Sequence, residues 1–217
     1  MDKQQRLAEL RKTARCGDGP PQCGLDSVDG LLDMIEHARP KKVLELGCDM
    51  GVSTECFLLH CDEVFAMDPW GYFPDVVLPV NKIKADEEKD HLDRWNLHGE
   101  RFMARCGSYS NLTVIRDYSP RGVLKMVPQY LGYFDLVYID AVHEYQPILD
   151  DIRAVHPLIR DGGWIAGHDY WHPNNEQDTI PLVDGLFGDD KKVFSDGSWL
   201  VRRPSFIPVP ADKAKWS

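Results

Sequence analysis

The stretch VLELGCDMGVSTECFLLH, residues 43–60, contains the pattern from which the class of fold follows. Its first part, residues 43–47, is a short and mostly apolar run that ends in glycine. From residue 53 to residue 60 the apolar residues recur at helical spacing. A strand, a turn and a helix are therefore predicted in that order.

The same alternation recurs along the rest of the chain. Further strands are predicted over residues 63–67, 112–116, 134–139 and 164–167, and helices over residues 1–15, 25–37, 84–105 and 145–159. Residues 195–198 form a tight turn between two last strands, residues 192–194 and 199–202. Because right-handed crossovers place each helix back over the sheet, the strands of such a chain are parallel. We predict an α/β fold, Rossmann-like and doubly wound, with a mostly parallel seven-stranded sheet and an antiparallel strand from the terminal hairpin.

A chain of 217 residues fits one domain. Within it we expect a helical segment packed on the core (residues 1–40), the Rossmann-like domain (residues 41–203) and a C-terminal tail (residues 204–217). Hydrophobic residues make up 43% and charged residues 28%, which is ordinary globular usage.

Lys and Arg number 25 against 35 Asp and Glu, which gives a net charge of −10. A surface this acidic repels phosphate backbones and anionic lipid, so we expect no nucleic-acid partner and no membrane partner. No apolar run approaches the roughly 20 residues that cross a bilayer, and the first residues lack the apolar stretch of a secretory signal. We therefore expect a cytoplasmic protein.

In that reducing compartment the six cysteines are expected to be thiols. Cys48, Cys56 and Cys61 lie in or beside the first strand–helix unit and are expected in the core. The spacing of Cys16 and Cys23 is not that of a zinc-binding pair.

Ligands of open α/β sheets bind beyond the carboxyl ends of the strands. The turn after the first strand carries Asp49 and Val52 where a dinucleotide-binding GxGxxG loop has its second and third glycines. A carboxylate there repels a pyrophosphate but tolerates a ligand with a sulfonium and an ammonium group. Asp68 follows the second strand, where a carboxylate accepts hydrogen bonds from ribose hydroxyls. The pattern indicates a nucleoside ligand without a diphosphate.

Several stretches of the sequence resemble the class I S-adenosylmethionine-dependent methyltransferases, in particular a subgroup that acts on small molecules. These stretches are residues 43–54, AMDPW at residues 66–70, and the pair FDLVYIDAVHEYQPILDDI and LIRDGGWIAGHDYW. The resemblance covers residues 43–202 and implies S-adenosylmethionine as cofactor. It implies three sets of cofactor-binding residues: Glu45, Gly47, Asp49, Gly51, Ser53 and Thr54 around the methionyl part, Asp68 with Pro69 and Trp70 at the ribose, and Asp117, Tyr118 and Ser119 beside the adenine. Asp49 stands where the commoner residue is glycine.

Asp140 and Asp169 follow the fourth and fifth strands, and neighbouring strands lie ~4.8 Å apart. Two carboxylates suit Mg²⁺, and a ligand from His168 or His143 moves the preference toward Mn²⁺ or another first-row ion. We predict a metal site of Asp140, His168 and Asp169, with His143 as a candidate catalytic base and Asp140 as a further catalytic residue. The alternative is structural, because such Asp residues also cap helices and such His residues also serve as their partners.

We therefore expect methyl transfer from S-adenosylmethionine to an oxygen of a small molecule, either a sugar or a hydroxylated metabolite. Two alternatives stay open: a binding module for S-adenosylmethionine or another nucleoside that has lost turnover, and an NAD-dependent oxidoreductase, which Asp49 and Val52 disfavour. A monomer and a homo-oligomer are both compatible with the sequence.

Overall fold

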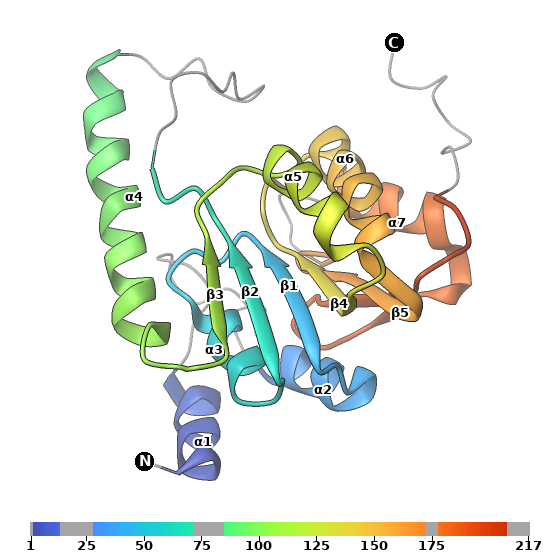
Figure 1. The fold of residues 1–217 in the computed structure, drawn as a ribbon, viewed down its shortest axis with the longest axis horizontal. Helices are drawn as coiled ribbons and strands as arrows, with labels where there is room; N and C mark the ends of the chain where they lie inside the picture. The colour runs from blue at the N-terminus through green and yellow to red at the C-terminus, as the bar shows by residue number, and fades with distance from the viewer. Residues whose placement is uncertain (1, 14–27, 72–84, 172–177, 208–217) are drawn as a thin grey trace.

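A seven-stranded sheet forms the centre of the protein (Figure 1). The computed structural model describes residues 2–13, 28–71, 85–171 and 178–207, and for residues 85–94 the backbone alone. The strands are β1 (Lys42–Leu46), β2 (Glu63–Met67), β3 (Leu112–Ile115), β4 (Phe134–Ile139), β5 (Ile159–Gly167), β6 (Lys192–Val193) and β7 (Trp199–Arg202), in the spatial order β3-β2-β1-β4-β5-β7-β6. The first five pair in parallel, and β7 runs antiparallel to both of its neighbours. The predicted class of fold is confirmed.

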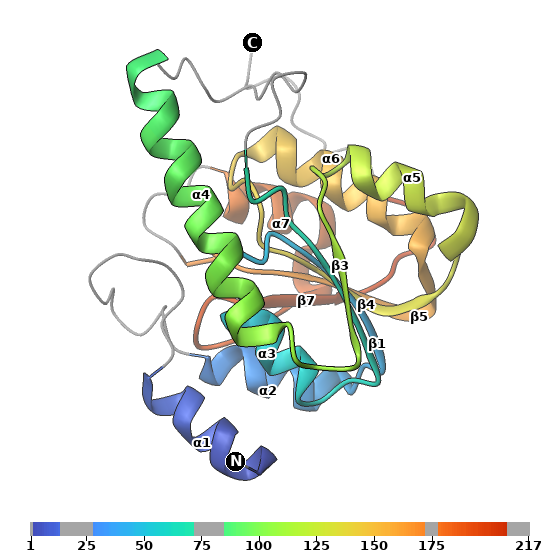
Figure 2. The same ribbon diagram turned by 60° about the vertical axis from the view of Figure 1, so that its left-hand side comes forward.

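Helices cover both faces of this sheet (Figure 2). One face carries α2 (Asp29–Ala38), α3 (Val52–Leu58) and α4 (Ala85–Cys106), and the other carries α5 (Arg121–Tyr130), α6 (Tyr145–Val155) and α7 (Thr179–Phe187). The short helix α1 (Lys3–Thr13) packs on the first face through Leu10. Successive side chains of a strand point to opposite faces, so Val43 enters the first core and Leu44 the second.

The strand register brings the carboxyl ends of the central strands to one edge. Leu46 at the end of β1 pairs with Met67 of β2 and with Ile139 of β4, and Ile139 pairs with Gly167 of β5. The residues that follow these strands therefore begin at the same level. We call this the carboxyl edge of the sheet.

The segment after α6 differs from its prediction. The helix ends at Val155 and not at Ile159, because Pro157 cannot continue the backbone hydrogen bonding. A short 3₁₀ turn (His156–Leu158) follows, and Ile159 already begins β5. The pairing partners then jump from Ile159 to Trp164, so the Gly162–Gly163 pair lies in a bulge and not before the strand.

Two helices were not predicted. In α5 an apolar stripe is present, but Pro128 interrupts the helical pattern. In α7 the proline Pro181 lies in the first turn, where its missing N–H costs nothing. Residues 178–184 therefore belong largely to a helix. The rest of the expected loop at residues 172–184, and the loop at residues 72–84, lie outside the described residues.

Cys48, Cys56 and Cys61 are buried free thiols, as predicted, and Cys106 of α4 joins them. Cys16 and Cys23 lie outside the described residues. Among the described helices, none is both long and apolar enough to cross a bilayer.

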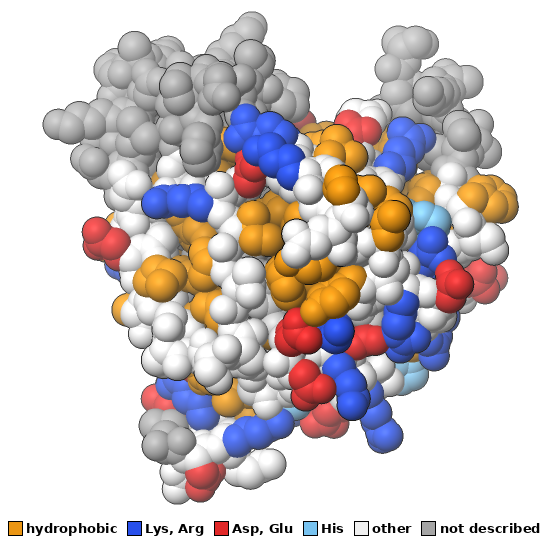
Figure 3. Space-filling view, in the orientation of Figure 1, with side chains coloured by type: hydrophobic (Ala, Val, Ile, Leu, Met, Phe, Trp, Pro, Cys, Tyr) orange, Lys and Arg blue, Asp and Glu red, His pale blue; other side chains and the backbone are white. Residues whose placement is uncertain are grey.

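Several large apolar side chains are exposed, among them Met103, Val114, Leu124 and Leu131. Figure 3 shows hydrophobic side chains gathered on the face that it views. The homo-oligomer stays an expectation, and so does the division into segment, domain and tail.

Candidate active site

The loop that joins β1 to α3, residues 47–51, is called the β1 loop below. Gly47 and Gly51 begin and end it with φ of 80° and 81°, in the left-handed region that favours glycine. A Cβ on Gly47 would lie 2.1 Å from the carbonyl oxygen of Asp140. The β1 loop therefore lies directly against the end of β4.

Asp49, the departure from the family pattern, also adopts a left-handed backbone, with φ of 43°. Its N–H donates to Asp68 Oδ2 at 3.0 Å, and its carbonyl accepts from Trp70 Nε1 at 2.7 Å. Its carboxylate pairs with the imidazole of His98 from α4. These contacts hold a conformation that costs a non-glycine residue about 1–2 kcal/mol. The sequence offered no signal for the part played by His98.

Glu45 is completely buried beneath the first turn of α3. The hydroxyls of Ser53 and Thr54 donate to its two carboxylate oxygens. Burial raises the pKa of Glu45 to about 7, although these hydroxyls oppose the shift. The three residues, predicted to surround the methionyl part of a cofactor, are thus brought together as a hydrogen-bonded unit.

Asp68 organises the β1 loop from the end of β2. Its Oδ2 accepts the backbone N–H groups of Cys48 and Asp49, at 2.9 and 3.0 Å, and its Oδ1 accepts that of Trp70 at 2.9 Å. Burial raises the pKa of Asp68, and these three bonds counter it. A carboxylate has about four acceptor positions, and these three N–H groups occupy three of them.

Pro69 and Trp70 fix the segment after β2. The Trp70 ring is buried with its centre 4.4 Å from that of Phe102 in α4. Arg116 donates to the carbonyls of both Pro69 and Trp70, at 3.2 and 2.5 Å. The indole ring therefore joins the β2 segment to α4.

The three residues expected beside an adenine, Asp117, Tyr118 and Ser119, contact different parts of the structure. Asp117 accepts from Arg121 at 2.7 Å and from Lys125 at 2.6 Å, and although burial opposes it, these cations lower the pKa of Asp117. Ser119 donates to Asp151 of α6 at 3.0 Å, and Tyr118 donates its hydroxyl to the Gly71 carbonyl at 3.1 Å. The Asp117 and Ser119 side chains are thus engaged by the helices behind them.

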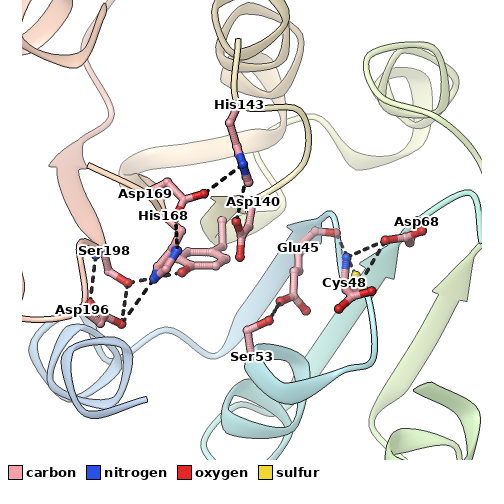
Figure 4. Close-up of polar contacts among 12 residues, drawn as sticks. Glu45, Cys48, Ser53, Asp68, Asp140, His143, His168, Asp169, Asp196 and Ser198 are labelled. Carbon is pink, nitrogen blue, oxygen red and sulfur yellow. Dashed lines mark hydrogen bonds and ion pairs between the residues drawn. The ribbon is translucent and has the colours of Figure 1, made fainter. Parts of the chain in front are cut away.

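Asp140, His143 and Asp169 form what we call the Asp–His cluster (Figure 4). His143 lies between the two carboxylates, with Nε2 3.2 Å from Asp140 Oδ1 and Nδ1 2.9 Å from Asp169 Oδ2. The ligand atoms of the three side chains all lie within 4.8 Å of one another. The expected convergence of Asp140 and Asp169 is therefore present, because β4 and β5 pair as predicted.

Contacts within the cluster shift the pKa values of His143 and Asp169 in opposite directions. Burial lowers the pKa of His143, but the hydrogen bonds and charges of Asp140 and Asp169 outweigh it and raise that pKa to about 10. Burial opposes ionisation of Asp169, yet His143 and His168 hold its pKa well below the usual range. An imidazolium carries a proton on both ring nitrogens, so His143 would have to lose one of them before it could act as a base. Its role as base stays a prediction.

His168 lies on the far side of Asp169 from His143. Its Nδ1 is 3.0 Å from Asp169 Oδ1, and its Nε2 is 3.8 Å from Asp196 Oδ2. Burial lowers the pKa of His168, but the surrounding carboxylates, Asp140 first among them, raise it to about 9. Of the two histidines that the sequence offers as metal ligands, His143 lies among the grouped ligand atoms and His168 does not. Asp196 was not anticipated, since it lies in a turn far along the chain.

Residues 44–170 match the family model described as a methyltransferase domain, Methyltransf_24. The chain belongs to this family. The match covers more than half of the chain and confirms the class I S-adenosylmethionine-dependent methyltransferase that the motifs indicate. It also speaks against the NAD-dependent alternative.

Similar proteins agree on the fold. A putative caffeoyl-CoA O-methyltransferase from Staphylococcus aureus is 15% identical, with 92% of this chain and 90% of that chain covered and a TM-score of 0.52. The N-methyltransferase NodS from Bradyrhizobium japonicum, in complex with S-adenosyl-L-homocysteine, is 16% identical, with 93% and 98% covered and a TM-score of 0.52.

A curated relative is an uncharacterised protein of Acanthamoeba polyphaga mimivirus, 26% identical over 110 residues. The match covers 49% of this chain and 45% of the relative, so the chain spans less than half of that protein's length.

Proposed function

We propose that the chain transfers the methyl group of S-adenosylmethionine to an oxygen of a small hydroxylated molecule at the carboxyl edge of the sheet. One observation carries the proposal: the β1 loop and the Asp–His cluster adjoin, because Gly47 packs on the Asp140 carbonyl. A donor in the loop and an acceptor at the cluster would then be neighbours, and holding two reactants in line is a large part of catalysis for such a transfer.

The proposed cofactor site consists of the β1 loop, Ser53, Thr54, Asp68 and the segments after β2 and β3. The free acceptor position of Asp68 is offered to a ribose hydroxyl. S-adenosylmethionine supplies an electrophilic methyl group on a sulfonium cation, which the acidic edge around Asp140 would attract. The other predicted contacts, including Pro69, Trp70 and residues 117–119, stay proposals.

The donor set of the Asp–His cluster fits a divalent cation. Asp140, Asp169 and His143 offer two carboxylate oxygens and one imidazole nitrogen within 4.8 Å of one another. Carboxylates suit Mg²⁺ and Mn²⁺, and the imidazole favours Mn²⁺. When bound, such an ion would lower the pKa of an acceptor hydroxyl. A protonated His143 would balance one of the two carboxylate charges, so cation binding would compete with its proton.

Two partly exposed apolar residues lie beside cluster residues in the sequence. Val142 is 38% exposed and Trp171 is 50% exposed, and they lie next to His143 and close to Asp169 in the chain. An acceptor with an apolar body and a hydroxyl would pack against them and direct its oxygen to the cluster. Sugars and hydroxylated metabolites both provide such an oxygen.

Calorimetry with S-adenosyl-L-homocysteine tests the cofactor part. We expect binding by the wild type and at least about ten-fold weaker binding by Asp68→Ala, since that variant also loses the bonds that order the β1 loop. Absence of binding by the folded wild type would refute the proposal.

A screen of hydroxylated and amine acceptors, with and without chelator, tests the reaction. We expect transfer to hydroxyl groups that chelation removes and Mn²⁺ restores. Transfer to amines alone would assign N-methylation, and cofactor binding without transfer to any acceptor would favour the binding module.

A further inference from the structure

The terminal hairpin reaches the Asp–His cluster through buried side chains. Asp196 and Ser198 lie in the turn between β6 and β7, and both are almost completely buried. Asp196 Oδ2 faces His168 Nε2 at 3.8 Å, and His168 Nδ1 contacts Asp169 Oδ1 at 3.0 Å (Figure 4). Among the described residues, Nε2 has no hydrogen-bond partner, and Asp196 Oδ2 is a carboxylate oxygen within 4.0 Å of it.

Asp196 is itself held in place by several elements. The backbone N–H and the hydroxyl of Ser198 donate to its two oxygens at 2.9 and 3.0 Å. The N–H of Leu31, in the first turn of α2, also bonds to Asp196. Residue 28 before α2 is a valine, which cannot cap a helix, so Asp196 caps α2 from the hairpin. A Cβ on Gly30 would lie 2.1 Å from Asp196 Oδ1, which shows how closely the helix approaches.

The same turn holds the backbone after β5. Asp169 has a φ of 60°, a left-handed conformation that costs a non-glycine residue about 1–2 kcal/mol. The N–H of Tyr170 donates to the carbonyl of Gly197 at 3.0 Å. Strained residues of this kind persist only where their surroundings determine them. The turn therefore constrains both the backbone beside Asp169 and, through His168, its carboxylate.

We propose that Asp196 is a positioning residue of the methyl-transfer site. It holds His168 against Asp169 Oδ1, and this contact leaves Oδ2 facing His143 at 2.9 Å. Without it the Asp169 carboxylate can rotate about its side-chain bonds, and His143 loses a fixed partner. The importance for catalysis rests on the proposed function, whereas the coupling from Asp196 to His143 concerns this chain's own residues.

The test compares ring ¹⁵N chemical shifts of His143 at one pH in the wild type and in Asp196→Asn. Asparagine keeps an oxygen for the N–H groups of Ser198 and Leu31 but removes the charge that faces His168. We expect the His143 ring resonances to move, although two other side chains separate the two residues. Mn²⁺ affinity, where the wild type binds Mn²⁺, is expected to fall about ten-fold or more.

Asp135→Asn is the matched control. Asp135 also accepts two backbone N–H groups, those of Lys41 and Lys42 at 2.8 Å, and pairs with Arg160, but it lies at the opposite end of β4. This variant should lose stability and leave the His143 resonances in place. If Asp196→Asn does not fold, Ser198→Ala removes one donor to Asp196 and should move the same resonances by less.

Unchanged His143 resonances in a folded Asp196→Asn protein, or equal changes in the Asp135→Asn control, would overturn the positioning role. A wild type that binds no Mn²⁺ refutes the metal part of the proposed function instead. The His143 resonances decide the present proposal in either case.

Discussion

The two halves of the carboxyl edge treat their acidic side chains differently. At β1 and β2, Glu45 and Asp68 receive hydrogen bonds from hydroxyls and backbone N–H groups, which carry no net charge. At β4 and β5, Asp140 and Asp169 face the imidazole of His143. Neutral donors do not overcome burial, so the pKa of Glu45 rises to about 7, whereas the histidines keep Asp169 ionised.

The difference shows how one sheet edge provides two kinds of site. The β1–β2 half holds Glu45 and Asp68 through hydroxyl and backbone N–H donors, and Asp68 orders the β1 loop. The β4–β5 half places the His143 imidazole between two carboxylates. The following predictions test whether the halves are as distinct as this comparison says.

The largest effect is expected where the halves touch. Gly47→Ala places a Cβ 2.1 Å from the Asp140 carbonyl oxygen at a φ of 80°. Overpacking and left-handed strain together should lower the free energy of unfolding by about 3 kcal/mol, measured by urea denaturation. Gly132→Ala is the control, because its φ is 60° but the nearest atom lies 3.9 Å away. A loss of about 1 kcal/mol is expected there, and equal losses would mean that the contact with Asp140 is not tight.

The next prediction rests on the proposed function and tests whether each half of the edge binds a different ligand. Asp169→Asn should weaken Mn²⁺ binding about 10–100-fold and change the affinity for S-adenosyl-L-homocysteine little. Asp68→Asn should weaken the binding of S-adenosyl-L-homocysteine and change the affinity for Mn²⁺ little. Calorimetry with each ligand measures both, and variants that affect both ligands alike would contradict the separation of the halves.

A smaller effect is expected in the pH dependence of the free energy of unfolding, through Glu45 in the β1–β2 half. Burial raises the pKa of Glu45 from 4.5 to about 7, so the folded state favours the protonated carboxyl. The associated stability is fully present below pH 4.5 and is lost as the pH rises through about 7. Between pH 5 and pH 8 the wild type should therefore lose on the order of 2 kcal/mol relative to Glu45→Gln.

Glu100→Gln, at an exposed position of α4, provides the control for this pH series. Its unfolding free energy should follow that of the wild type at every pH. Parallel curves for the wild type and Glu45→Gln would show that Glu45 stays ionised throughout.

His143 should respond to pH in the same direction as Glu45 but over a higher pH range. Its pKa is raised from 6.5 to about 10, so its contribution is complete below pH 6.5 and disappears as the pH rises through about 10. NMR titration of the ring should give a midpoint near the higher value, and one below 7 would contradict the ion pairing with Asp140 and Asp169.

The smallest effect concerns Asp49. Asp49→Gly and Asp49→Ala both remove the contact with His98, but only glycine accepts a φ of 43° without strain. The glycine variant should be about 1 kcal/mol more stable than the alanine variant in urea denaturation. Equal stability would mean that the β1 loop relaxes out of the left-handed conformation.

Most of the fold could be predicted because its signals are local. Short apolar runs ending in Gly47, Asp68 and Asp140 mark buried strands, and the stripe of α6 marks a helix. The exceptions have local causes as well: Pro128 interrupts the pattern of α5, and Pro157 ends α6 before its apolar stripe ends.

The sequence by itself determined that acidic residues follow several strands and meet at one edge, because parallel strands with a common register bring their carboxyl ends together. Only the tertiary structure decided which partner each carboxylate has. His143 and His168 contact different oxygens of the Asp169 carboxylate, and Asp196 comes from the turn between β6 and β7, beside the end of β5. Such pairings depend on side-chain rotamers and on contacts between segments far apart in the chain, which periodicity and spacing do not encode.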